Sequence, residues 1–120
     1  MIKVIYDSER NTIIAEFSGK IDVAQAEQFY ADIQKTVPQC GKGFKLLTDL
    51  SAVETVDLKI QGAIKKVMDF LNQRGVAEIL RVIPDPAVDI GLNIMSRFHY
   101  SKDVQFLTLQ SREEALARLS

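Results

Sequence analysis

Five runs of the chain have the apolar pattern of β-strands. The first two, residues 2–6 and 12–17, are rich in β-branched and aromatic side chains, and a polar loop of hairpin length separates them. In the second run Ile13, Ala15 and Phe17 fall on one face, which predicts a strand that is buried on that side. The other three predicted strands are compact apolar runs at 44–47, 78–83 and 104–109.

Two longer segments between these runs have apolar residues at helical spacing. A Ser-Gly-Lys turn predicted at 18–20 leads to Asp22, whose carboxylate suits the N-cap of the first helix, and Pro38 ends that helix. The second helix is predicted to begin near Lys59, after a loop that follows the third strand. It ends before Gly75, a residue that suits a left-handed backbone conformation.

Two further helices are predicted in the last part of the chain. Asp85 and Pro86 suit an N-cap and the first helical position, and an apolar stripe follows over 88–98. The last helix opens with Ser111 and Glu114, which have the spacing of a capping box. The order β-β-α-β-α-β-α-β-α predicts a single α/β domain over all 120 residues. We expect a mixed sheet whose parallel strands are joined by crossover helices packed mainly on one face.

Composition limits the classes of function. The chain is 47% apolar and 26% charged, as in ordinary globular proteins, and its formal charge is −1 without a basic block of the kind that binds nucleic acid. No apolar run approaches the roughly 20 residues that span a bilayer, and the N-terminus has no signal-peptide core. The single cysteine, Cys40, cannot form an internal disulfide, so we expect a soluble, cytoplasmic protein.

Two separated segments resemble those of a known family. The third predicted strand ends in Asp-Leu-Ser at 49–51, Asp57 follows, and Gly62 lies early in the next helix. The tail, at 103–106 and 111–116, completes a resemblance to the STAS domain, the family of bacterial anti-sigma-factor antagonists. In that family Asp-Leu-Ser-Gly-Val ends a strand, and Asp-Ser-Ser-Gly-Leu-Gly opens a helix. The resemblance implies the STAS fold and a role in protein interaction.

The match fails at the residue that the family phosphorylates. Leu58 stands where the family has the serine that accepts phosphate from a partner kinase, and Lys59 and Ile60 replace the next serine and the first glycine. A leucine has no hydroxyl group. The resemblance therefore implies an interaction module that cannot be switched by phosphate at this position.

Asp57 and two nearby hydroxyl residues each allow a structural and a functional interpretation. Asp57 could contact a partner, or it could be only the N-cap of the following helix, which is the interpretation we favour. Ser51 and Thr55 could replace the missing phosphoacceptor, but serine after a strand more commonly hydrogen-bonds its own turn.

Leu58 lies outside the apolar stripe of the second helix and is expected to be exposed, whereas Ile60 fits the stripe and is expected in the core. The hypothesis is that Leu58, with Asp57, Lys59 and Gln61, forms a constitutive docking surface for a partner protein.

Other candidate chemistry is weak. His99 has no companion ligands, Cys40 has no activating neighbour, and the Cys-Gly-Lys-Gly-Phe segment at 40–44 lacks the Gly-Lys-Ser/Thr ending of a phosphate loop. Asp85 and Asp89 lie four positions apart, one at the N-cap and the other in the first turn of a predicted helix, where negative charge is stabilising in any case. We therefore predict no catalytic residues, no metal and no cofactor.

The sequence thus predicts a non-enzymatic STAS-like module in bacterial regulation, whose partner is a regulatory protein such as an anti-sigma-like kinase. The alternative is a carrier of a small molecule or lipid, held in an apolar cavity between helices and sheet. A homo-oligomer could form if the exposed hairpin strand pairs with its counterpart in a second copy.

Overall fold

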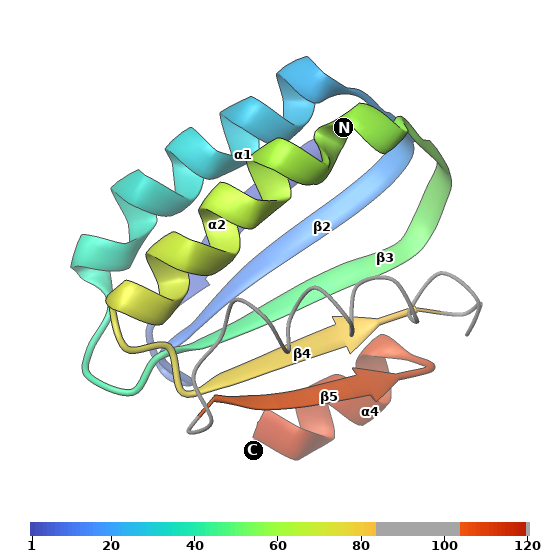
Figure 1. The fold of residues 1–120 in the computed structure, drawn as a ribbon. Helices are drawn as coiled ribbons and strands as arrows, with labels where there is room; N and C mark the ends of the chain where they lie inside the picture. Colours follow the sequence, from blue (N-terminus) through green and yellow to red (C-terminus); the bar gives the residue numbers. More distant parts are fainter. Residues whose placement is uncertain (84–103, 120) are drawn as a thin grey trace.

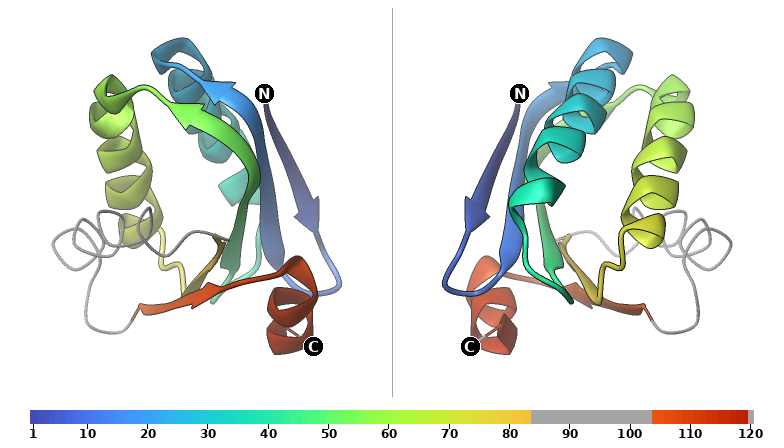
Figure 2. Two further views of the ribbon diagram at one scale, coloured as in Figure 1. Left: turned by 90° about the vertical axis from the view of Figure 1, so that its right-hand side faces the viewer. Right: turned by 90° about the vertical axis from the view of Figure 1, so that its left-hand side faces the viewer.

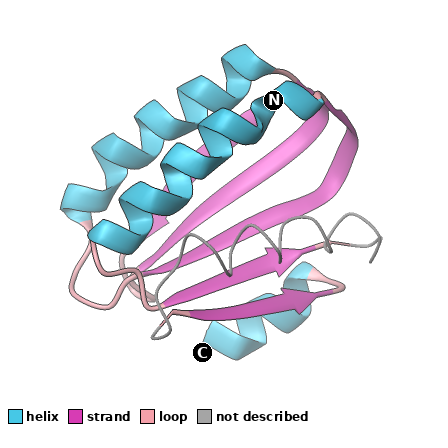
Figure 3. Ribbon diagram, viewed as in Figure 1, coloured by secondary structure: helices cyan, strands magenta, loops and turns pink. Residues whose placement is uncertain are grey.

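The computed structural model describes residues 1–83 and 104–119, which form a five-stranded mixed sheet with helices on both faces (Figure 1 and Figure 3). Neighbouring strands follow the order of the sequence. The strands are β1 (Ile2–Asp7), β2 (Thr12–Ile21), β3 (Lys45–Val56), β4 (Glu78–Val82) and β5 (Gln105–Leu109).

The sheet has one antiparallel pair and three parallel pairs. β1 and β2 form the antiparallel hairpin, whereas β2–β3, β3–β4 and β4–β5 are parallel. Parallel neighbours need a crossover, and α1 (Val23–Thr36) provides it between β2 and β3, as α2 (Gln61–Gln73) does between β3 and β4. α1 ends at Thr36, and a 3₁₀ turn that contains Pro38, Val37–Gln39, follows it directly. The predicted α/β class and mixed sheet are confirmed.

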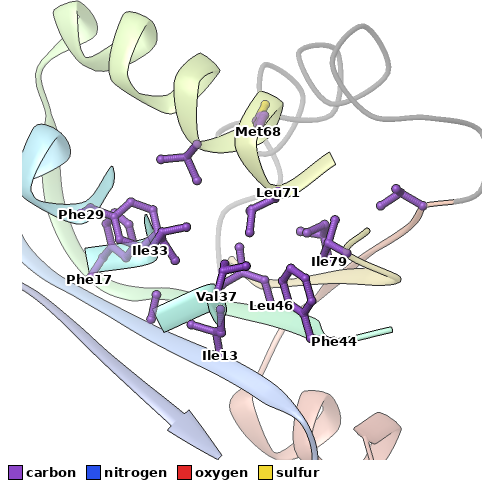
Figure 4. Close-up of a cluster of buried hydrophobic side chains, with 14 of the residues drawn as sticks. Ile13, Phe17, Phe29, Ile33, Val37, Phe44, Leu46, Met68, Leu71 and Ile79 are labelled. Carbon is purple, nitrogen blue, oxygen red and sulfur yellow. The ribbon is translucent and has the colours of Figure 1, made fainter. Parts of the chain in front are cut away.

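The main core lies between the sheet and the pair α1 and α2 (Figure 2 and Figure 4). The predicted inward face of β2 contributes Ile13, Ala15 and Phe17, all buried. The Phe17 ring meets the Phe29 ring of α1 edge-to-face, with 5.0 Å between centroids. Leu71 of α2 is fully buried in the same cluster. Aliphatic and aromatic side chains from both helices therefore fix how the helices sit on the sheet.

A smaller core covers the opposite face, where α4 (Arg112–Leu119) packs. Its buried members come from β2, β3, β4 and α4: Ile14, Leu47, Leu80, Val82, Ala115 and Leu119. Ion pairs hold α4 at its two ends: Arg118 Nε lies 3.2 Å from Glu78 Oε1, and Arg112 Nη1 lies 2.5 Å from Glu16 Oε1. α4 thus lies on the face that α1 and α2 leave open.

The central strands are longer than predicted, and the predicted turn at 18–20 and loop after the third strand are wrong. β2 continues to Ile21 and β3 to Val56, and the two strands pair with each other over these extensions. Two register shifts within the pairing absorb extra residues of β3. Residues that usually form turns are here in strands, because the backbone of each extension hydrogen-bonds to the backbone of the other.

Most of the predicted helix boundaries are confirmed. Asp22 and Gln25 form a capping box at the start of α1, and Gly75 after α2 has a φ of 81°. Ser111 Oγ accepts a hydrogen bond from the Glu114 amide at 3.2 Å. The Glu114 side chain accepts one from the Gln110 amide, at 3.5 Å, and not from the Ser111 amide that the predicted capping box requires. The predicted helix over 88–98, with its cap Asp85, and the residues Asp89 and His99 lie outside the described residues.

Candidate functional site: the start of helix α2

The extensions of β2 and β3 form a two-stranded ribbon that projects beyond the rest of the sheet (Figure 1). β1 begins opposite Phe17, and β4 ends opposite Asp49, so neither strand flanks the ribbon. At its tip Ile21 pairs with Val56, and the Asp57 amide donates a hydrogen bond to the Ile21 carbonyl at 2.9 Å. The ribbon therefore fixes where the chain enters α2.

Asp57 caps the segment that follows. Its Oδ1 accepts a hydrogen bond from the Lys59 amide at 2.9 Å, and its carbonyl accepts one from the Ile60 amide at 3.1 Å. The capped segment, Leu58–Ile60, is a single 3₁₀ turn, and α2 begins at Gln61 rather than near Lys59. The predicted capping role of Asp57 is confirmed.

Leu58 is the most exposed large apolar side chain of the described residues, with 81% of its surface accessible. Val56, two residues earlier, is 42% accessible, and sequence reasoning missed it because this part of the chain was expected to be a loop. Asp57, Lys59 and Gln61 are exposed as well. The structure thus places all four predicted docking residues together in one exposed segment.

Ile60 shows why this segment presents Leu58 to solvent. Its side chain is half-buried and packs against the main core, although it was predicted to be a full core residue. Because the 3₁₀ turn anchors Ile60 inward, Leu58 points away from the core. Hereafter Val56, Leu58, Lys59 and Gln61 are called the α2 entry surface.

The alternative phosphoacceptors differ in their surroundings. Ser51 lies at a register shift in β3, and its hydroxyl and amide both donate to Asp49 Oδ1, at 2.5 and 3.0 Å. This is the predicted local hydrogen bonding, although it occurs within a strand and not in a turn. Thr55 is exposed in the ribbon, paired with Lys20.

A shallow hollow of about 210 Å³ lies on the α4 face, over β2 and β3. Its charged lining consists of Lys3, Glu16, Asp49 and Arg112, and Arg112 lies between the two carboxylates, 3.9 Å from Asp49 Oδ2. Arg112 therefore ties α4 to β2 and β3. Sequence reasoning missed these contacts because Arg112 is far along the chain from both carboxylates, 96 positions from Glu16.

Outside the α2 entry surface, the described residues offer little metal-binding or nucleophilic chemistry. Over residues 1–83 and 104–119 no group of three histidine, cysteine or carboxylate side chains is placed to hold a metal ion. Burial raises the pKa of the Cys40 thiol, which disfavours the reactive thiolate. The Gly41 amide donates to Asn11 Oδ1 at 2.8 Å, so this glycine-rich loop is tied to the β1–β2 turn. The described helices include none long and apolar enough to cross a bilayer.

The family model of the STAS domain matches residues 3–111. The chain belongs to the STAS domain family. STAS domain proteins are typically binding modules rather than enzymes. No curated protein matches the chain.

Several solved structures share this STAS fold. The unphosphorylated anti-sigma factor antagonist SpoIIAA is 18% identical, with a TM-score of 0.71, and the match covers 99% of this chain and 97% of that one. An uncharacterised protein with a SpoIIAA-like fold from Shewanella loihica is 12% identical, with a TM-score of 0.75 and coverage of 100% and 93%. A chain in the complex of the diguanylate cyclase SiaD with its activator SiaC, from Pseudomonas aeruginosa, is 11% identical, with a TM-score of 0.58 and coverage of 91% and 93%. These similarities establish the fold.

Proposed function

We propose that this chain is a non-enzymatic STAS module of bacterial regulation that binds a regulatory protein through the α2 entry surface, without a phosphate switch at that surface. The observation that carries the proposal is the exposure of Leu58 at the start of α2. Burying a leucine side chain contributes about 2 kcal/mol, and at Leu58 most of that contribution is left for a partner to supply.

The neighbouring side chains support docking rather than chemistry. Val56 extends the apolar area, while Lys59 and Gln61 add a charge and an amide at its border. An apolar centre with a polar rim is the usual anatomy of a protein–protein interface. An anti-sigma-like kinase or a similar regulatory protein is the class of partner that the family suggests.

The proposal that this surface has no phosphate switch rests on the residue at position 58. In the family resemblance this position carries the phosphorylated serine, whose charge would be set among free amides at a helix start. Here the position carries Leu58, and the Lys59 amide is already occupied by Asp57. Binding is therefore expected to be constitutive. No observation on the described residues favours the carrier alternative.

A comparative pull-down tests the proposal. Wild type, Leu58→Asp and Ile5→Asp are used to capture proteins from the native lysate, with quantitative mass spectrometry of each eluate. Ile5 is a matched control because it is also an exposed apolar residue, 43% accessible, and lies on a different strand. We expect a regulatory protein that is retained by wild type and Ile5→Asp and lost with Leu58→Asp. Equal capture by all three proteins would show that the partner does not bind through the α2 entry surface.

Asp57 is tested separately because it caps the segment. Asn and Asp are equivalent N-caps, so Asp57→Asn keeps the cap and removes the charge, whereas Asp57→Ala loses both. If Asp57 contributes only the cap, the partner binds Asp57→Asn as it binds wild type. Weaker binding of Asp57→Asn, with unchanged unfolding free energy, would instead make Asp57 a partner contact.

A further inference from the structure

β1 forms an open edge of the sheet (Figure 2). It pairs with β2 on one side, and the described elements include none that pairs with its other side. An unpaired edge is a template for a further strand. Its side chains and backbone determine which strand that can be.

The hydrogen bonds at the start of β1 show which backbone groups face outward. The Met1 amine donates to the Ser18 carbonyl at 2.6 Å, and the Ser18 amide donates to the Met1 carbonyl at 2.8 Å. Hydrogen-bonded and non-hydrogen-bonded pairs alternate along an antiparallel ladder. Lys3, Ile5 and Asp7 therefore bond to β2, and the backbone groups of the residues between them face outward.

The outward groups, on Ile2, Val4 and Tyr6, restrict how a second β1 can pair antiparallel to the first. Hydrogen bonds form across the edge only when even-numbered residues lie opposite even-numbered residues. Placing Val4 opposite Tyr6 of a second copy satisfies this condition, and both residues then exchange their backbone hydrogen bonds. In the same register Ile5 lies opposite its own counterpart on a two-fold axis.

This register is also complementary in side chains. It places Lys3 of each copy opposite Asp7 of the other. The hydrogen bond from Arg10 lowers the pKa of Asp7 below its usual value of 3.8, so the carboxylate is ionised at neutral pH. The pairs Lys3–Asp7 and Ile5–Ile5 are non-hydrogen-bonded ones, in which side chains lie closest. In the neighbouring register, with Val4 opposite Val4 of the second copy, Lys3 would lie opposite Ile5 instead.

We propose that the chain forms a two-fold symmetric dimer by antiparallel pairing of β1 with β1 of a second copy, centred on Ile5. The sheet then continues across both copies, and the exposed Ile5 side chains cover each other. The contact is short, so we expect a dissociation constant in the micromolar range or weaker. The inference is independent of the α2 entry surface.

Sedimentation equilibrium of the full chain over a concentration series tests the dimer. We expect the apparent mass of wild type to rise from 13.5 kDa toward twice that value. Ile5→Asp sets two carboxylates against each other on the axis, and it should raise the dissociation constant at least about tenfold. Val56→Asp is the matched control, because Val56 is 42% accessible and Ile5 is 43% accessible, and it should dimerise as wild type does.

Cysteine cross-linking tests the register. In a Cys40→Ala background, Ile5→Cys places two thiols opposite each other with Cα atoms about 4.5 Å apart, within the range of a disulfide. We expect an oxidised dimer from Ile5→Cys and none from Val4→Cys, because Val4 faces Tyr6. An apparent mass of wild type that stays at 13.5 kDa up to about 1 mM would overturn the proposal, since this range covers weak complexes. Preferential cross-linking at Val4 would overturn it as well.

Discussion

At the scale of single residues, exposure and backbone conformation decide which side chains matter. Leu58 and Ile60 are both aliphatic and two positions apart, yet the first is in solvent and the second packs against the core. The sequence predicted this difference correctly in direction, because only Ile60 fits the helical stripe. It could not predict the half-burial of Ile60, which depends on a 3₁₀ turn preceding α2.

Two glycines give a matched test of backbone conformation. Gly75 has a φ of 81°, whereas Gly62 lies in α2 with no positive φ, and neither has any atom within 4 Å of an added Cβ. Gly75→Ala should lower the free energy of unfolding by about 1 kcal/mol through left-handed strain. Gly62→Ala should raise it by up to about 1 kcal/mol, because alanine is the better helix former. Urea denaturation measures the free energy of unfolding of both variants. Equal changes in the two variants would contradict the left-handed backbone conformation assigned to Gly75.

Cys40 should react slowly with alkylating agents. Burial raises its thiol pKa above the ordinary value of 9.0, so less thiolate is present at pH 8 than in a free cysteine. We expect alkylation by iodoacetamide at pH 8 to be several-fold slower in the native protein than in urea. The rate should rise as the pH approaches the raised pKa. Equal rates in native and unfolded protein would show that the thiol is accessible and unperturbed.

At the scale of elements, the sequence predicts features that are completed within a few residues, such as helix caps. It does not predict which distant segments pair as strands. Caps at Asp22, Asp57 and Ser111 were predicted from residue type alone, because a cap is satisfied within a few residues. The extensions of β2 and β3 were missed because their strand conformation depends on a partner more than 30 residues away. The segment 18–20 has turn residues, and only its pairing with β3 makes it a strand.

The capping box of α1 can be measured directly. Asp22→Ala removes the acceptor for the Gln25 amide, at 2.9 Å, and should cost about 1 kcal/mol of stability. Asp22→Asn keeps an equivalent acceptor and should cost only a few tenths of that. Chemical denaturation of the two variants separates the hydrogen bond from the charge. A loss as large in Asp22→Asn as in Asp22→Ala would assign the effect to the charge.

At the scale of the whole molecule, the sequence could predict the fold. For the function it could predict only a class, a protein-interaction module, and not the partner. Apolar periodicity predicted the order of the described elements, and the STAS resemblance supplied the arrangement that the structure confirms. Asp57, Leu58, Lys59 and Gln61 could be nominated because family residues could be aligned to them, and the structure shows them exposed. Val56 and the Arg112 contacts required three-dimensional pairing. The partner, the cytoplasmic location and the absence of a cofactor stay predictions.

The contribution of Leu58 to binding is measured by isothermal titration calorimetry of the captured partner with purified wild type and with Leu58→Asp. The exposed Leu58 supports little of the fold, so the variant should unfold within about 0.5 kcal/mol of wild type. We expect a dissociation constant at least about tenfold higher for Leu58→Asp, and we expect Ile5→Asp to bind as wild type does. Equal affinities for wild type and Leu58→Asp would show that the partner does not dock on the α2 entry surface.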